Sequence, residues 1–385
     1  NEPGGAHHKS YLAAFVDYWK KRDARRIYTA GAGWPLIPEN EYHSDPTPRI
    51  QRWEEGLKSI INAQAPSTNY DWSDIVKSYD KPVVSHEIGQ WCVYPNFDEM
   101  KKYTGVLQPR NFELFQETLT ENKMGHLADD FLEASGKLQT ICYKSDIEAA
   151  LRTPGFGGFQ LLDLHDFPGQ GTALVGVLDA FWDEKGYVTP EAYNRFCSET
   201  VPLARLPKMV YQTNETLSGS VESAHFGAQP IAGVSVYWKL QDARDNVDIA
   251  NGKWDNVTLR LGNNQKVGNV NHKLEGLTRP SKLKLIVGIE GTKFENDWEI
   301  WVYPSDLKIP STDIVVTRKW DEQTRSALEK GKKVLLVLEK NSIKPEKGGD
   351  VAVGFSSIFW NTSWTRGQAP HTLGILCDPS NEVFK

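Results

Sequence analysis

Apolar and polar positions alternate in different ways along the chain, and the first part has the pattern of mixed helices and strands. Between Leu12 and Trp19 apolar residues recur at i, i+3, i+4 and i+7, which predicts a helix with one apolar face. The following segment RRIYTAGAGWP predicts a short strand at Ile27–Thr29 that runs into a glycine-rich loop. The opening NEPGG resembles the end of a strand, so we expect the chain to begin inside a domain.

Two later segments have the clearest pattern of buried strands. KPVVSHEIGQW places Glu87 at the carboxyl end of an apolar run, and GFGGFQLLDLHDFPGQG ends in polar residues and a Gly/Pro loop. Apolar helix faces are expected between them, at Phe112–Leu119 and Leu127–Leu138. Repeated strand, polar tip, loop and helix is typical of a parallel sheet or barrel, which we expect over residues 1–206.

The pattern changes near Pro207. SGSVES, GVSVYWKL, NVTLRL, KLKLIVGIEG and DWEIWVYP are short strand-like runs separated by Gly, Asn and Asp clusters. They predict an immunoglobulin-like β-sandwich over residues 207–306. DIVVT, DEQTRSALEKG and KKVLLVLE then predict one βαβ unit, and hence a partial α/β domain over residues 307–385.

Composition excludes some classes of function. The formal charge of −6 argues against nucleic acid as the main partner, because phosphate binding needs concentrated positive charge. No run approaches the roughly 20 apolar residues of a membrane span. The four cysteines have neither C-x-x-C spacing nor a Cys/His pattern, so we expect them to be unpaired. The 13 tryptophans fit large cores and sugar-stacking platforms equally well.

Two glutamates are the candidates for catalysis. Glu2 and Glu87 each stand where a strand is expected to end and a glycine-containing loop to begin. In a barrel of parallel strands the active site lies at that carboxyl face. A pair of carboxylates there suits glycoside hydrolysis, in which one acid protonates the leaving oxygen and the other attacks the anomeric carbon or activates water. Read alone, Glu2 also fits a carboxylate at a helix N-terminus.

With these residues in place, the sequence resembles the clan A glycoside hydrolases. An Asn-Glu pair is followed 85 residues later by a second Glu at a strand end, and NEPGG, YTAGAGWP, VVSHEIGQW and GFQLLDLHDFPGQGTALVG together resemble the family-two-like glycosidases of gut Bacteroidetes. The resemblance implies the C-terminal part of a (β/α)8 barrel, from its fourth to its eighth strand, followed by a β-sandwich. It also implies that the earlier strands and the N-terminal domains of the same polypeptide are missing from this chain.

The resemblance also implies roles for single residues. Glu2 matches the acid/base, Glu87 the nucleophile, and Asn1 the residue that holds the sugar 2-hydroxyl. It implies a retaining exo-acting β-glycosidase located in the periplasm or outside the cell. We expect β-galactosidase-like activity on an oligo- or polysaccharide, and the only reason is that this activity is common among family-two-like enzymes. We expect neither a metal nor another cofactor.

Other residues near the expected strand ends are candidates for substrate contact. They are Tyr28, Trp34, Trp91, Tyr94, Asp163 and His165. Simple loop packing is an equal alternative for Trp91 and Tyr94. His86 is expected to point into the barrel wall, because side chains alternate along a strand.

Two further hypotheses stay open at this point. The chain fits a non-catalytic carbohydrate-binding or scaffolding protein on a glycosidase-like fold, which would have no need of both carboxylates. It also fits, less well, a metal-dependent hydrolase centred on the DLHD segment that contains Asp163, His165 and Asp166.

Overall fold

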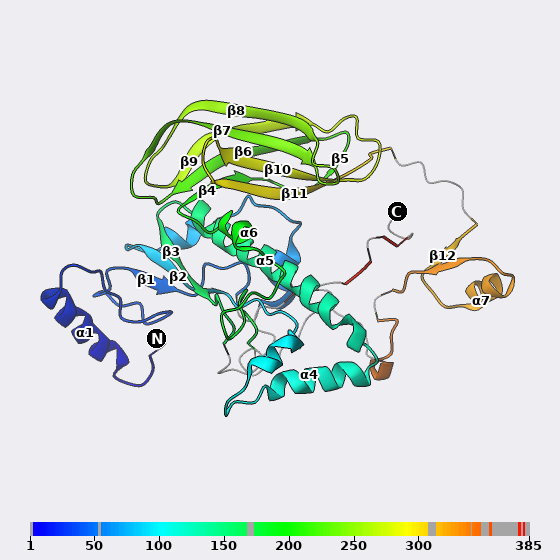
Figure 1. Cartoon of the computed structure of the whole chain (residues 1–385), viewed down its shortest axis with the longest axis horizontal. Helices are drawn as coiled ribbons and strands as arrows, with labels where there is room; N and C mark the ends of the chain where they lie inside the picture. The colour runs from blue at the N-terminus through cyan, green and yellow to red at the C-terminus, as the bar shows by residue number, and fades with distance from the viewer. Residues whose placement is uncertain are drawn as a thin grey trace. The chain divides into compact units, whose positions relative to one another are not determined.

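A computed structural model of the chain describes residues 3–52, 55–167, 173–306, 313–339, 341–347, 354–355, 376–378 and 380–381. The chain divides into two compact units, shown in Figure 1. The first comprises Asn1–Tyr303 with Gly354–Lys385, and the second is Pro304–Val353. The predicted domain bounds at residues 206 and 306 stay predictions.

The first part of the larger unit contains a three-stranded parallel sheet and its helices. The strands are β1 (His43–Asp45), β2 (Val83–Gly89) and β3 (Phe156–Leu162), in the order β1-β2-β3. Both pairs are parallel, as the alternation of strands and helices predicted. The carboxyl ends of all three strands therefore meet at one edge of the sheet. Whether these strands belong to a (β/α)8 barrel stays a prediction.

Helices lie before, between and after these strands in the chain. They are α1 (His8–Arg22), η1 (Gly56–Lys58), α2 (Ile60–Ala63), α3 (Ser73–Val76), η2 (Phe97–Lys102), α4 (Arg110–Glu121), η3 (Gly125–Leu127), α5 (Ala128–Arg152) and α6 (Pro190–Asn194). The long helix α5 contacts β2 and β3. Tyr143, Ile147 and Ala150 recur on its buried face at helical spacing, and this apolar stripe explains why the helix covers the sheet.

One predicted strand is wrong. Residues Ile27–Thr29 form no strand, and side chains satisfy the local backbone groups instead. The N–H of Tyr28 donates to Glu41 at 2.9 Å, and the N–H of Ala30 donates to the Asn40 side chain at 2.7 Å. Because these donors are already paired with side chains, the segment does not need a neighbouring strand.

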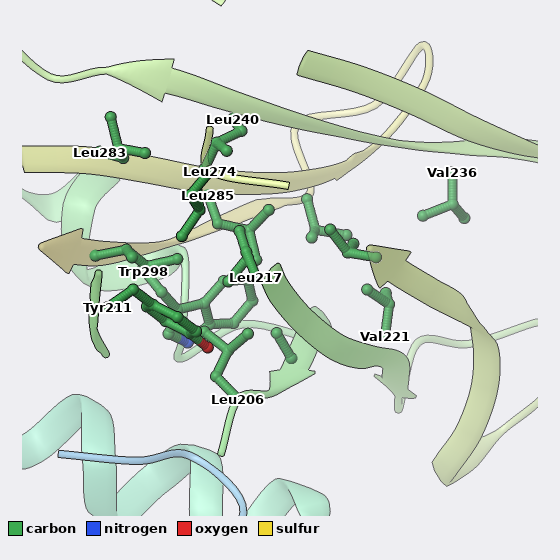
Figure 2. Close-up of a cluster of buried hydrophobic side chains, with 14 of the residues drawn as sticks. Leu206, Tyr211, Leu217, Val221, Val236, Leu240, Leu274, Leu283, Leu285 and Trp298 are labelled. Carbon is green, nitrogen blue, oxygen red and sulfur yellow. The ribbon is translucent and has the colours of Figure 1, made fainter. Parts of the chain in front are cut away.

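Two sheets form a sandwich in the second part of the larger unit. One has the order β4 (Thr200–Arg205), β6 (Thr216–His225), β9 (Gly262–Lys273), and the other the order β5 (Val210–Gln212), β11 (Glu295–Tyr303), β10 (Ser281–Ile289), β7 (Ile231–Asp242), β8 (Asp248–Leu259). Figure 2 shows the apolar side chains buried between them, among them Leu217, Leu240 and Leu285. Alternate residues of β11 are buried, as expected for a strand with one face on the core.

The second unit is small. It consists of β12 (Val315–Thr317), α7 (Glu322–Glu329), β13 (Val334–Leu336) and the short η5 (Pro345–Lys347). β12 and β13 pair in parallel, so the predicted βαβ unit is present. The Asp321 carboxylate accepts from the N–H of Thr324 at 2.9 Å and caps α7.

Among the helices that the structure describes, none is long and apolar enough to cross a bilayer. The four cysteines all lie in the described residues and form no disulfide.

Candidate active site

A bulge in β2 positions the candidate nucleophile. Ser85 pairs with Phe159 and Ile88 pairs with Leu161, so His86 and Glu87 both lie opposite the single residue between those partners. Glu87 adopts a positive φ of 51°. A bulge of this kind adds one residue to a strand and changes the direction of the side chains beside it.

The bulge brings the buried His86 side chain beside Glu87, and whether its ring points into a barrel wall stays a prediction. His86 Nε2 lies 3.4 Å from Glu87 Oε1, because the alternation of side chains is broken at this point. On its other side, His86 Nδ1 lies 3.2 Å from Gln160 Oε1. The Ser44 hydroxyl donates to the same Gln160 oxygen at 3.0 Å. The ring is therefore held between the carboxylate and a fixed amide.

The Glu87 carboxylate is partly exposed and also contacts neighbouring side chains. Its side chain is 20% exposed, whereas that of His86 is buried. Gln90 Nε2 donates to Glu87 Oε2 at 3.3 Å. Each carboxylate oxygen thus has a nitrogen neighbour, and part of the group still faces open space.

Arg49 supplies a buried positive charge behind the bulge. Its Nη2 donates to the backbone carbonyl of His86, and the guanidinium is buried. Burial lowers the pKa of Arg49, while the carboxylates of Asp146, Glu87 and Asp45 act in the opposite direction. Within the described residues, Arg49 Nε has no hydrogen-bond partner. The cation therefore interacts with Glu87 through space and fixes the backbone one residue before it.

Asp146 of α5 ties the segment that follows Glu87 to the segment that contains Arg49. Its carboxylate accepts from the N–H of Ile50 at 2.8 Å, from Trp91 Nε1 at 3.1 Å and from the N–H of Gly89. Burial raises the pKa of Asp146 to about 6, against the effect of these donors. The chain just after Glu87 and the residue next to Arg49 are thus attached to one buried side chain.

A loop connects the beginning of the described chain with His86. A Cβ placed on Gly33 would lie 2.8 Å from the His86 ring, and a Cβ on Gly31 would lie 3.0 Å from the Pro3 ring. Trp34, which is 41% exposed, donates through Nε1 to the Pro3 carbonyl at 3.0 Å. The candidates Asn1 and Glu2 lie outside the described residues.

Three predicted contact residues make contacts within the protein. The Tyr28 hydroxyl donates to the Asp23 carbonyl at 2.9 Å. Trp91 is 4% exposed and belongs to the hydrophobic core. Tyr94 lies among aromatic rings, the nearest being Phe131 at 5.3 Å between centroids. These surroundings favour the packing alternative for Trp91 and Tyr94.

Asp163 and His165 follow the carboxyl end of β3. Asp163 Oδ1 accepts from the N–H of Leu164 at 2.6 Å. The His165 ring lies against Trp182, with 4.5 Å between centroids. Trp182 was missed in the sequence, because it stands in a segment with no strand or helix pattern.

Arg49 and Asp146 were also missed. The signal for Asp146 was present, since a carboxylate stands between Tyr143 and Ala150 on the apolar face of a helix. Arg49 stands in a Pro-rich segment whose pattern predicts no element.

The geometry gives little support to a metal centre in DLHD. Asp166 is buried and pairs with the ammonium of Lys185 at 2.6 Å. In the part of the chain that the structure describes, no three His, Cys, Asp or Glu side chains are grouped so that they could hold a metal ion. A buried ion pair of this kind serves the fold rather than a ligand set.

Two family models match parts of the chain, and both describe domains of unknown function. DUF8488 matches residues 215–304 and DUF8487 matches residues 315–385. No curated protein matches the sequence.

Several solved structures are similar to parts of the chain. A β-D-mannosidase from Dictyoglomus thermophilum is 12% identical, with a TM-score of 0.39, over 82% of this chain and 43% of that chain. A β-glucuronidase from Parabacteroides merdae is 13% identical, with a TM-score of 0.20, over 28% and 14%. The sporulation control protein Spo0M from Bacillus subtilis is 13% identical, with a TM-score of 0.21, over 35% and 56%. The chain thus spans less than two thirds of each, and similarity at this level establishes neither its fold nor its activity.

Proposed function

We propose that the protein is a retaining β-glycosidase in which Glu87 is the nucleophile and Glu2 the acid/base. The observation that carries this proposal is the placement of Glu87 at a bulge beside the carboxyl edge of a parallel sheet. Its carboxylate is partly exposed, with His86 and Gln90 beside it and the buried Arg49 cation within electrostatic range. A terminal β-galactoside is the expected substrate.

The surroundings of Glu87 suit an attacking carboxylate. In the first step a Glu87 oxygen forms a bond to the anomeric carbon as the bond to the leaving oxygen breaks, and Glu2 gives that oxygen its proton. In the second step Glu2 takes a proton from water, whose oxygen displaces Glu87. Asn1 holds the sugar 2-hydroxyl in both steps.

The loop at residues 31–34 supports the pairing of Glu87 with Glu2. Pro3 follows Glu2 in the sequence and packs on Gly31 and Trp34, while Gly33 packs on His86. One short loop therefore contacts both the residue next to Glu2 and the residue next to Glu87. The proposal requires the two carboxyl groups to lie about 5 to 5.5 Å apart.

The test combines covalent labelling with chemical rescue. The protein is incubated with aryl β-glycosides and their 2-deoxy-2-fluoro analogues, and mass spectrometry locates the label. We expect label on Glu87. Azide should restore turnover to Glu87→Ala with an α-glycosyl azide as product, and to Glu2→Ala with a β-glycosyl azide. Label on another residue, or undiminished turnover in Glu87→Gln, would contradict the assignment.

A second candidate function is glycan binding without catalysis. The observation that favours it is the exposed indole of Trp34 beside the candidate site, since apolar sugar faces stack on such rings. Binding of a glycan by the protein without any turnover across the aryl glycoside panel would support this function against the first.

A further inference from the structure

Trp182 stands on the surface in an unusual backbone conformation. Its side chain is 59% exposed, and its φ is 71°. A bulky residue with positive φ is rare, because the Cβ crowds the following carbonyl oxygen. Such residues persist only where surrounding contacts determine them, and they are concentrated at functional sites.

Asp179 organises the loop that carries Trp182. Its buried carboxylate accepts from the N–H groups of Phe181 at 2.8 Å and Asp183 at 3.0 Å, and its carbonyl accepts from the N–H of Trp182 at 3.1 Å. Burial opposes ionisation, but the Lys102 ammonium and the two side-chain-bound N–H groups together lower the pKa of Asp179. The carboxylate therefore stays charged and keeps the loop in one conformation.

The two aromatic residues of this loop have different neighbours. The Phe181 ring contacts Tyr103, the residue that follows η2, with 4.9 Å between centroids. The Trp182 ring lies instead on His165, tilted by 38°. More than half of the Trp182 side chain is exposed, so it presents an apolar surface next to an imidazole.

This surface lies at the same edge of the sheet as Glu87. Gln90, which donates to Glu87, also donates through its N–H to the Leu162 carbonyl at 2.7 Å. His165 follows Leu162 by three residues, a length of chain that spans about 10 Å at most. In addition, Lys102 of η2 binds both Asp179 and Asp183, so the Trp182 loop is attached to the segment that follows Glu87.

We propose that His165 and Trp182 form a stacking platform for the sugar ring on the leaving-group side of the scissile bond. The apolar face of that ring would lie on the indole. The inference rests on the proposed function and deepens it, because it makes the natural substrate a disaccharide or longer glycan rather than a glycoside of a small alcohol.

The first test measures binding in the catalytically blocked Glu87→Gln protein. Lactose, cellobiose and β-mannobiose are titrated calorimetrically, with and without the added change Trp182→Ala. We expect at least one disaccharide to bind and Trp182→Ala to weaken that binding about tenfold, while Trp182→Phe keeps most of it. Trp320→Ala is the matched control, because Trp320 is 55% exposed in the second unit and should not affect binding.

The second test measures turnover in the protein with Glu87 intact. Trp182→Ala should lower kcat/KM about tenfold for the disaccharide and leave kcat/KM for the glycosyl fluoride of the same sugar unchanged. Equal losses on both substrates, unchanged disaccharide binding, or no disaccharide binding at all would overturn the platform. Trp182-dependent binding with no turnover by the protein would refute the glycosidase and leave the platform standing.

Discussion

The parallel-sheet region and the sandwich bury different kinds of side chain. The core between the two sandwich sheets is mostly apolar, with Leu240, Leu283 and Leu285 fully buried (Figure 2). The parallel-sheet region buries charges, including the pair Asp166 and Lys185 and the carboxylate of Asp146. An apolar core needs no partners, whereas each buried charge must be paired or it weakens the fold.

Unpaired polar atoms follow the same division. Of the twelve buried side-chain atoms without a hydrogen-bond partner in the described residues, nine belong to residues before β4. Arg49 Nε, Gln90 Oε1 and Glu99 Oε2 are among them. Since such groups destabilise a protein that does not use them, we expect the sandwich to supply stability and the function to lie in the parallel-sheet region.

The largest expected effect lies where the two regions meet, at Glu148 of α5. Its carboxylate pairs with Lys144 at 2.6 Å and Arg152 at 3.1 Å, and it accepts from Trp298 Nε1 of the sandwich at 3.0 Å. Glu148→Ala leaves the buried Arg152 without its counter-charge, so we expect the free energy of unfolding at pH 7 to fall by about 4 kcal/mol. Urea denaturation measures the change.

The pH dependence of the Glu148 effect checks its cause. Burial opposes ionisation, but Lys144 and Arg152 lower the pKa of Glu148 below its usual value. The stability that the carboxylate contributes is therefore present above about pH 4.5 and is lost as the pH falls through the lowered pKa. A penalty for Glu148→Ala that stayed the same well below pH 4 would show that lost packing, and not lost charge, is responsible.

A cavity in the sandwich should lower stability without changing activity. Leu285→Ala removes a fully buried side chain of β10, and we expect the free energy of unfolding to fall by about 3 kcal/mol. The activity of the remaining folded protein should not change. Val247→Ala, at an exposed position of the same sandwich, serves as control, and its free energy of unfolding should differ from that of the parent by less than about 0.5 kcal/mol. Lost activity in folded Leu285→Ala would break the division between the regions.

The sequence predicted the strands of the two regions better than it predicted the contacts of the candidate site. Strand alternation revealed the sandwich strands β6, β7, β10 and β11, because one face of each lies on an apolar core. It did not reveal β9, whose segment GNNQKVGNVNHK is mostly polar. Glu87 was found from its place after an apolar run, but its contact with His86 depends on a bulge that no residue pattern encodes. Asp146 reaches this site from α5, more than fifty residues away, so only the fold brings it there.

Buried Glu99 should lower the stability of the parallel-sheet region at high pH. Burial raises the pKa of Glu99 to about 7, and Asp166 and Asp179 add to the effect. The folded state therefore binds the proton more tightly than the unfolded state, and stability falls as the pH rises from about 4.5 to about 7. Glu99→Gln removes this loss. Its free energy of unfolding should therefore exceed that of the parent by about 3 kcal/mol at pH 8 and equal it at pH 4.

Unfolding in urea at pH 4, 6 and 8 measures this difference. Glu290→Gln, at an exposed position of the sandwich, is the matched control and should differ from the parent by the same small amount at each pH. A Glu99→Gln difference that is independent of pH would mean that the carboxyl group does not titrate in this range.

The smallest effect compares two glycines that share a backbone conformation and differ in their neighbours. Gly33, beside the candidate site, has φ 83°, and Gly233 of the sandwich has φ 68°. Alanine at either position costs about 1 kcal/mol for the left-handed conformation. A Cβ on Gly233 meets nothing closer than 3.8 Å, but one on Gly33 lies 2.8 Å from the His86 ring. Gly33→Ala must therefore also displace His86 from Glu87.

We expect Gly233→Ala to lose about 1 kcal/mol of stability and no activity, and Gly33→Ala to lose about 2 kcal/mol and at least tenfold in kcat/KM. Thermal unfolding and glycoside turnover measured on the same samples separate the two losses. Equal activity in both variants would mean that the position of His86 beside Glu87 does not matter for turnover. A loss of activity in Gly33→Ala alone would show that turnover is sensitive to a small displacement in the parallel-sheet region and not in the sandwich. The reason would be that the packed His86 ring fixes the position of the Glu87 carboxylate.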